Sequence, residues 1–187
     1  EQGLKDVHHA SEMTGLFFDM INSYPKPVVM LAEGAAMAGG LGMLCAGDIV
    51  VVTEDCKFAL TETTLGIPPA QIAPFVSQRI GLAKARRIML TAARFTGKEA
   101  HEMGLADFVA KDADDLKVIE SDIKKGVLKC APGANAVTKE IVLATRHLTR
   151  KEMIEFAAKG FAERMLSDEG KEGISSFIEK RKPKWSK

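Results

Sequence analysis

The sequence predicts an α/β fold in which short buried strands alternate with amphipathic helices. Short runs of apolar and β-branched residues, such as Ile49–Thr53, are separated by stretches whose apolar residues recur every three or four positions. Alternation of this kind is typical of sheets with parallel pairing. The chain has 187 residues, of which 46% are hydrophobic and 27% charged, and this composition suits one sizeable core.

The first part of the chain supplies the strands and the helices between them. Residues 7–23 follow the helical period, and the prolines at 25 and 27 end that helix and open a strand. Further helices are expected over 73–80 and 82–90, and from Thr96, which has the spacing of a capping box with Glu99, to Gly104. The expected strands are Val28–Leu31, Ile49–Thr53, Phe58–Leu60 and Phe108–Ala110.

A change from alternating elements to continuous helix near residue 112 divides the chain into two regions, 1–111 and 112–187. Acidic residues at 112, 114 and 115 favour a solvated turn at the start of the second region. From Leu116 to Lys180 the pattern is helical, with expected breaks at 131–135 and 167–170.

The most informative segment is a run of small residues between Glu33 and Asp48. One strand leads into it and the next strand follows it, so we interpret the run as a glycine turn and a short buried helix between two strands. Glycine tolerates positive φ, and the first turn of a helix offers unpaired N–H donors, so this run suits an anion or a developing oxyanion. Tight packing of small residues is an equal alternative, whereas about 14 apolar residues are too few to span a membrane.

Charge and motifs argue against several classes of partner and cofactor. The net charge of +1 gives no reason to expect nucleic acid or an anionic membrane. Neither a P-loop nor a dinucleotide-binding glycine motif is present, and the four histidines lack the spacing of metal ligands, so we expect no metal and no separate cofactor. Three cysteines without CxxC spacing, in apolar or strand-like surroundings, favour a reducing compartment, and we expect a cytoplasmic protein. Glu1 is not an initiator Met and no secretory signal follows it, so the chain is expected to be part of a longer polypeptide.

Glu62 is the candidate catalytic acid. It lies between the expected strand at Phe58–Leu60 and a proline-stiffened loop that begins at Gly66. Leu60 and Leu65 flank it, and partial desolvation by such neighbours favours the neutral form of a carboxyl group, which suits proton transfer. From the residues alone, a solvated surface carboxylate is the more ordinary explanation.

Four stretches, in this order, resemble the enoyl-CoA hydratase/isomerase family, also called the crotonase family. They are residues 26–34, 38–48, 58–66 and 177–180. The resemblance implies a crotonase-like spiral of ββα units followed by a C-terminal helical trimerisation region, assembled as a homotrimer or a dimer of trimers. It also implies that residues 1–111 are part of the spiral core that carries the active site, and that the N-terminal portion of the family fold is absent from this chain.

The resemblance further implies roles for single residues. The family stabilises the enolate oxygen of a coenzyme A thioester with two backbone N–H groups. Gly39 matches one of these oxyanion-hole donors, while the second comes from an early loop that this sequence lacks. Glu62 matches a glutamate that transfers a proton. The positions expected to bind the acyl group or the coenzyme A, which is part of the substrate, are Ala38, Gly40, Thr61, Leu65, Phe177 and Lys180.

Two departures from the family pattern bear on the reaction. Hydratases of this family commonly carry another glutamate, and its position falls on Gly42, so this chain keeps one carboxylate. Pro69–Ile72 replaces a glycine-rich sequence that often follows Pro68 in the family, which changes the pocket wall.

The leading hypothesis is an acyl-CoA lyase that adds water to a 2-enoyl-CoA. Residues 60–66 and 69–75 look most like family members that act on branched glutaconyl-CoA esters, and Thr61, Thr63 or Gln71 are candidates for placing the water. One alternative is a Δ3–Δ2 enoyl-CoA isomerase that uses the single Glu62. Another is a non-catalytic member that binds acyl-CoA or only oligomerises.

Overall fold

The computed structural model describes residues 1–186, and the chain divides into two compact units. The first unit comprises Glu1–Asn22 and Val28–Ser121, and the second comprises Ser23–Pro27 and the chain from Asp122 onward. Helix α6 (Ala113–Leu128) contributes residues to both units. Its first turn carries Asp114 and Asp115, in agreement with the acidic helix start expected from the sequence.

One sheet of the first unit is entirely parallel. Its strands are β1 (Val29–Ala32), β3 (Ile49–Thr53) and β6 (Phe108–Ala110), in the order β1-β3-β6. Three consecutive valines of β3, Val50 to Val52, are fully buried without alternation, as expected for the central strand of a parallel sheet. The bounds of β3 and β6 agree with the prediction, and β1 begins one residue later than predicted.

The second sheet has the order β2-β4-β5 and contains two strands that we did not predict. Strand β2 (Ala35–Met37) pairs parallel with β4 (Lys57–Ala59). The other side of β4 pairs antiparallel with β5 (Arg94–Thr96). The expectation of parallel pairing is therefore wrong for β4 and β5, where Phe58 stacks on Phe95 with ring centroids 5.5 Å apart.

Short helices connect the strands of the first unit. Helix α2 (Gly39–Ala46) follows β2, and the pair α3 (Ala73–Ile80) and α4 (Leu82–Leu90) has the predicted bounds. Gly81 joins α3 to α4 with a φ of +79°, a conformation that favours glycine. The remaining helix is α5 (Gly97–Glu102).

The predicted capping box at the start of α5 is confirmed. Thr96 Oγ1 accepts a hydrogen bond from Glu99 N, and the Glu99 carboxylate accepts one from Thr96 N. The carboxylate accepts hydrogen bonds from the backbone N–H and from the hydroxyl of Thr96, and these two bonds lower the pKa of Glu99. A bend at Gly104, which has a φ of +84°, follows the helix as expected.

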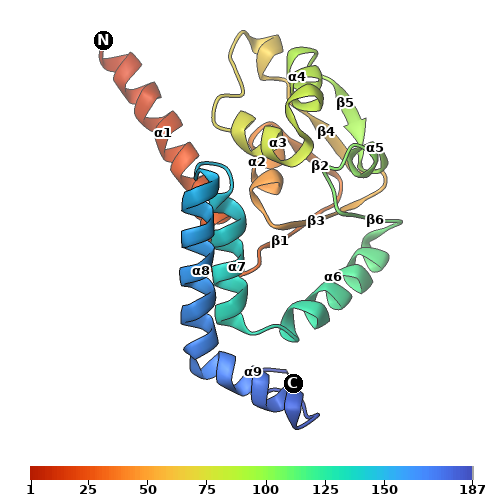
Figure 1. Cartoon of the computed structure of the whole chain (residues 1–187). Coiled ribbons are helices and arrows are strands. Elements are labelled where there is room, and N and C mark those ends of the chain that lie inside the picture. Colours follow the sequence, from red (N-terminus) through yellow and green to blue (C-terminus); the bar gives the residue numbers. More distant parts are fainter. Residues whose placement is uncertain (187) are drawn as a thin grey trace. The chain divides into compact units, whose positions relative to one another are not determined.

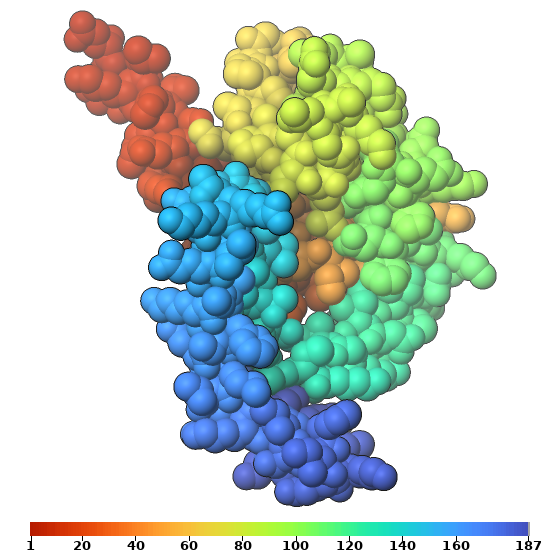
Figure 2. All heavy atoms as spheres, in the orientation of Figure 1, coloured from red at the N-terminus to blue at the C-terminus, as the bar shows by residue number. Residues whose placement is uncertain are grey.

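The first helix, α1 (Gln2–Ser23), starts earlier than predicted and is attached through few residues. Phe18 is buried against Phe75 of α3, with ring centroids 5.8 Å apart, and Asn22 is also buried. The N-terminal turns of α1 extend away from the sheets of their unit (Figures 1 and 2). Several apolar side chains of α1, among them Leu16 and Phe17, are exposed.

Helices alone make up the second unit after α6. They are α7 (Pro132–Ala144), α8 (Arg150–Leu166) and α9 (Asp168–Ile178). Helices α7 and α8 lie side by side (Figure 1). Among the described residues, no helix has the length and apolar character that would let it cross a membrane.

Breaks between these helices differ in part from the prediction. The predicted break at 131–135 is wrong for most of its length, because Pro132 starts α7 and proline is favoured at the first position of a helix. The break near Ser167 is confirmed, since Ser167 ends α8 and caps α9 by accepting a hydrogen bond from Gly170 N. A further break between α7 and α8, at residues 145–149, was not predicted.

Candidate active site

Parallel pairing of β2 and β4 places Gly39 and Glu62 beyond the same edge of the second sheet. Met37 lies opposite Ala59 in the register, and Ala38 N donates a hydrogen bond to Ala59 O at 3.0 Å. Parallel strands have their carboxyl ends at one edge, which is where ligands bind in many α/β proteins. The two residues predicted for catalysis therefore follow neighbouring strands from that edge.

Gly39 is the first residue of α2, and its N–H comes before the first hydrogen bond of that helix. In that first bond, Gly42 N donates to Ala38 O at 3.1 Å. The N–H groups at the start of a helix have no intrahelical partner, and the helix dipole makes this end partly positive. A Cβ atom on Gly39 would meet no atom within 4 Å, so open space lies on that side of the residue. The small-residue run thus contains the unpredicted strand β2, then the predicted turn and short helix.

Backbone strain marks the residue before the donor. Ala38 has a φ of +48°, which is unusual for a residue other than glycine. A conformation of this kind costs about 1–3 kcal/mol and persists where the surrounding structure enforces it. Here the pairing of β2 with β4, extended by the Ala38–Ala59 bond, supplies that constraint. Strained backbone next to an N–H donor is typical of a functional site.

Glu62 is buried, so the alternative of a solvated surface carboxylate is wrong. Its relative exposure is 9%, and it begins a short 3₁₀ helix, η1 (Glu62–Leu65), where we had predicted a loop. Within the described residues, Glu62 Oε2 is buried and has no hydrogen-bond partner. Of the two leucines expected to desolvate it, Leu60 is fully buried, whereas Leu65 is 74% exposed.

An unpaired carboxylate oxygen in the interior is costly. Buried polar atoms in native proteins nearly always have a partner, and an exception calls for an explanation such as catalysis. The local backbone holds the residue in place, because Glu62 O accepts a hydrogen bond from Ile67 N at 3.2 Å. Gly66, with a φ of +77°, ends the 3₁₀ turn. Glu62 is thus fixed in position, and its buried Oε2 lacks a hydrogen-bond partner among the described residues.

The three residues proposed to place water differ in their surroundings. Thr63 Oγ1 donates to Met89 O at 3.1 Å, and Gln71 Nε2 donates to Ser11 Oγ of α1 at 3.1 Å. These contacts tie both side chains to the scaffold. Thr61 is half-buried and directly precedes Glu62 in the chain.

Phe177 and Lys180, predicted to contact the coenzyme, lie at the end of α9 in the second unit. Phe177 is 85% exposed. Lys180 N donates to Phe177 O at 3.2 Å and Arg181 N donates to Ser176 O at 3.0 Å, the pair of bonds that defines a Schellman motif. Lys180 has a φ of +54° and takes the left-handed position that glycine usually occupies in this motif.

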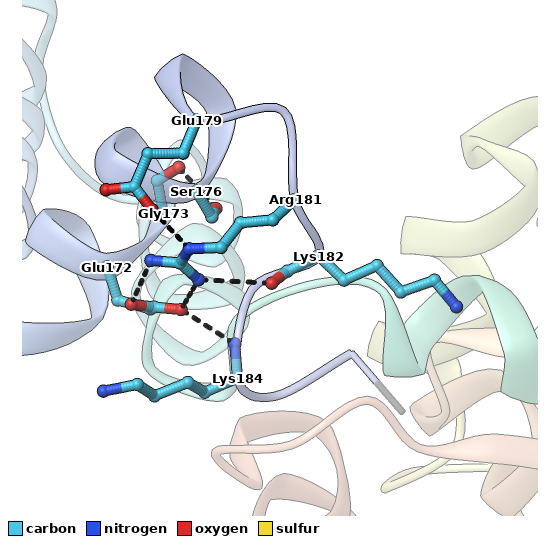
Figure 3. A network of polar contacts seen from close by, with 7 residues as sticks. All are labelled: Glu172, Gly173, Ser176, Glu179, Arg181, Lys182 and Lys184. Carbon is cyan, nitrogen blue, oxygen red and sulfur yellow. Dashed lines mark hydrogen bonds and ion pairs between the residues drawn. The ribbon is translucent and has the colours of Figure 1, made fainter.

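A polar network anchors the chain that follows Lys180 (Figure 3). The Arg181 guanidinium donates to both oxygens of Glu172, at 2.6 and 3.0 Å, and to Glu179 Oε2 at 2.6 Å. Hydrogen bonding to Arg181 lowers the pKa of Glu172 to about 2. The side chains of Lys182 and Lys184 extend away from this pair, so their ammonium groups remain available at the surface (Figure 3).

Gly42 lies against Ile72, a contact that the sequence did not reveal. A Cβ atom on Gly42 would come within 2.9 Å of both Cγ atoms of Ile72. Both residues are buried. The two departures noted in the sequence, at Gly42 and at Pro69–Ile72, are therefore one packing arrangement.

Histidines and cysteines contribute little to this site. Within residues 1–186 there is no cluster of side chains suited to a metal ion, and all four histidines are exposed. Burial raises the pKa of Cys45 to about 12 and that of Cys56 to about 11. The expectation of apolar surroundings is wrong for Cys130, which is exposed at the end of α6.

Comparison with known proteins decides the family. The sequence profile of the enoyl-CoA hydratase/isomerase family matches residues 5–187. The chain belongs to the enoyl-CoA hydratase/isomerase family. A probable enoyl-CoA hydratase of Bacillus subtilis is 31% identical over 98% of this chain and 72% of its own length. A peroxisomal Δ(3,5)-Δ(2,4)-dienoyl-CoA isomerase of Arabidopsis thaliana is also 31% identical, over 87% of this chain and 59% of its own length.

Solved structures of the family confirm the predicted crotonase-like fold. Pseudomonas aeruginosa AtuE superposes with a TM-score of 0.94 and 41% identity, over all of this chain and 71% of AtuE. An enoyl-CoA hydratase/isomerase from Marinobacter aquaeolei gives a TM-score of 0.91 and 37% identity, over 95% of this chain and 67% of that protein. This enzyme family includes both hydratases and isomerases, so the reaction has to be argued from the site.

Proposed function

We propose that this enzyme adds water across the double bond of a 2-enoyl-CoA thioester. The observation that carries the proposal is the edge shared by β2 and β4, where the Gly39 N–H and the buried Glu62 carboxylate follow neighbouring strands. A thioester carbonyl at the start of α2 would accept a hydrogen bond from Gly39, which stabilises the negative charge that develops on its oxygen. Loss of one such donor typically costs about 10²- to 10³-fold in rate.

Glu62 performs the proton transfers in this proposal. As the water oxygen bonds to C3, the carboxylate takes one proton from that water, and the C2–C3 double bond becomes an enolate whose charge lies on the thioester oxygen. Glu62 then returns the proton to C2, which regenerates the carboxylate and yields the 3-hydroxyacyl thioester. The buried Oε2, which has no protein partner among the described residues, is the oxygen available for this work.

Replacing Glu62 with Gln tests the assignment. General acid–base catalysis typically contributes 10²- to 10⁴-fold, so Glu62→Gln is expected to lower kcat for hydration by at least about 10²-fold. A neutral amide is less costly to bury than a carboxylate, so the variant should be at least as stable as the wild type. Glu54→Gln, which neutralises an exposed carboxylate after β3, is the matched control and should keep full activity. Unchanged hydration by Glu62→Gln would rule out its role.

Double-bond migration is the second candidate function, and the single carboxylate favours it. Here Glu62 would remove a proton from C2 of a 3-enoyl-CoA, the double bond would move to C2–C3, and the same proton would be delivered to C4. The contact between Gly42 and Ile72 leaves no room for another acid at that point of α2. Parallel assays with a 2-enoyl-CoA and a 3-enoyl-CoA separate the reactions, and absence of both would indicate a member that only binds acyl-CoA or oligomerises.

A branched glutaconyl-CoA ester is the substrate class that we propose within the hydratase reaction. Support comes from residues 60–66 and 69–75, which include Glu62 and Ile72, a residue of the expected pocket wall. The expected result is a higher kcat/KM for a 3-branched glutaconyl-CoA than for a linear 2-enoyl-CoA of equal chain length. The opposite order would reject this substrate class and leave the hydratase proposal standing.

Lys180 is proposed to bind a phosphate of coenzyme A, and its backbone conformation allows a substitution that tests this role. Because Lys180 has a positive φ, Lys180→Gly removes the ammonium group and at the same time relieves backbone strain. A hydrogen bond to a charged group contributes about 1.5–3 kcal/mol, so KM for the thioester should rise about tenfold or more with little change in kcat. A stable variant with unchanged KM would contradict the assignment.

Assembly as a homotrimer or a dimer of trimers is also a proposal. Helix α8 has no buried residue although it is 17 residues long. Its exposed apolar side chains, together with those of α9, are Ile154, Phe156, Phe161, Met165, Leu166, Ile174, Phe177 and Ile178. A second copy of the chain would cover such surfaces. Light scattering coupled to size exclusion should give three or six times the mass of one chain.

A further inference from the structure

We propose that Ile72 keeps the site to one carboxylate and thereby sets the balance between hydration and double-bond migration. The inference rests on the proposed function for its catalytic consequence, but its structural part stands on the packing of Ile72 against Gly42 alone. Gly42 lies in α2, whose N-terminus carries the Gly39 donor. Ile72 precedes α3 and packs over that helix.

The geometry of an α-helix explains why position 42 matters. The Cα–Cβ bonds of a helix tilt toward its N-terminus, and residues three apart lie on one face. A side chain at position 42 would therefore lean toward the turn that begins at Gly39. A carboxylate there would reach the region in which the thioester oxygen is proposed to bind.

Ile72 occupies that space with apolar atoms. Its Cγ1 and Cγ2 lie 2.9 Å, and its Cβ 3.3 Å, from the point where a Cβ on Gly42 would be. Because isoleucine is branched at Cβ, each of its rotamers would keep at least one Cγ atom in this space, so a change of rotamer alone cannot clear it. The backbone of Ile72 is held as well, since it is the N-terminal cap of α3 and its carbonyl accepts a hydrogen bond from Val76 N at 3.1 Å. Only 7% of the residue is exposed.

The consequence for the reaction follows from the number of proton carriers. Hydration needs two proton transfers, one from the attacking water and one to C2. With an acid at 42 and Glu62 both present, each group could perform one of them. With Glu62 alone, a single carboxylate must do both in turn, whereas migration needs only one group to move one proton. Ile72 therefore acts as a specificity-determining residue by excluding the second carrier.

A stability cycle tests the packing without reference to catalysis. Alanine is a better helix former than glycine, so in the Ile72→Ala background Gly42→Ala should raise Tm by about 2–4 °C. In the wild-type background the same change forces the new methyl group against Ile72 and should lower Tm. A change of sign between the two backgrounds supports the proposal. The same sign in both would overturn it.

An activity comparison tests the catalytic consequence. Gly42→Glu combined with Ile72→Ala should give a ratio of hydration to migration at least tenfold above that of Gly42→Gln combined with Ile72→Ala, which has the same size and lacks the acid. Equal ratios would overturn the role of Ile72 in reaction choice. If the wild type and all variants transform neither thioester, the proposed function fails, while the stability cycle still supports or overturns the packing of Ile72 against Gly42.

Discussion

Arg79 of α3 should contribute more to stability than any surface cation, because it holds three chain segments together. Its side chain is 12% exposed. The guanidinium donates hydrogen bonds to Leu105 O and to Gly47 O, the latter at 3.2 Å, and pairs with Asp107 Oδ2. Asp107 Oδ2 also accepts from Val50 N at 2.7 Å, so the group connects the end of α2 with β3 and the entry to β6.

The size of the effect follows from what Arg79→Met would leave behind. Leu105 and Gly47 are buried, and each of their carbonyl groups would lose a charged donor, at about 1–3 kcal/mol for each unsatisfied group. Asp107 is 42% exposed, so water can replace the arginine there and little is added. The free energy of unfolding should therefore fall by about 2–5 kcal/mol.

Urea unfolding followed by far-ultraviolet circular dichroism measures this loss. Arg86→Met is the matched control, because Arg86 is an exposed arginine on the adjacent helix α4, and it should change stability by less than about 0.5 kcal/mol. Asp107→Asn, which keeps an oxygen for Val50 N, should fall between the two variants. A loss below about 1 kcal/mol in Arg79→Met would refute the reasoning that buried carbonyl groups depend on Arg79.

Two further predictions concern the second unit and the thiols. Hydrogen bonding to Arg181 depresses the pKa of Glu172 from 4.5 to about 2, so its contribution to docking of the C-terminal segment is present above pH 4.5 and is lost as the pH falls toward 2. Trp185 is the single tryptophan of the chain, and its Nε1 donates to Lys129 O. In the wild type, the fluorescence of Trp185 should shift to the red as the pH falls over that range. In Glu172→Gln the emission should already be red-shifted at pH 7. Identical emission of both proteins at pH 7 would contradict this prediction. Alkylation of the native protein between pH 7 and 9 should modify Cys130 quickly and leave Cys45 and Cys56 unmodified, since burial raises the pKa values of these two thiols to about 12 and about 11. Any fast-reacting thiol in Cys130→Ser would contradict this, because only the two buried cysteines remain in that variant.

Local signals explain which elements could be predicted. The bounds of α3 and α4 are set by the helical period and by Gly81 between them, and the start of α5 is set by the Thr96 capping box. Strands β2 and β5 have three residues each, which is too short for a distinctive apolar alternation. They exist because β4 offers hydrogen-bonding partners on both sides, and such pairing between distant segments cannot be read from a short window of sequence.

In the candidate site too, features that depend on neighbouring residues could be predicted, and features that depend on distant contacts could not. Small residues and flanking strands predicted a glycine turn with a short helix and singled out Glu62, whereas the resemblance to the family was needed to name Gly39. The sequence left partial burial of Glu62 open beside a solvated surface position, and of the two leucines that suggested burial, Leu60 is buried and Leu65 is exposed. The role of Ile72 could not be foreseen, since it depends on a contact between α2 and the segment before α3, which are far apart in the sequence.

The sequence left two purposes open for the glycines of the small-residue run, tight packing and the binding of an oxyanion, and substitution should separate them. Gly47 needs to be small for packing, because a Cβ there would overlap Met30, so Gly47→Ala should destabilise the protein. Gly39 has open space around it and a φ that is not positive, so Gly39→Ala should keep or raise the stability, by up to about 1 kcal/mol from helix propensity. Its new methyl group would nevertheless stand where the thioester is proposed to approach, and turnover should fall. A Gly39→Ala variant that is stable and fully active would move the oxyanion away from this turn, whereas a stable and inactive one would assign the open side of α2 to substrate.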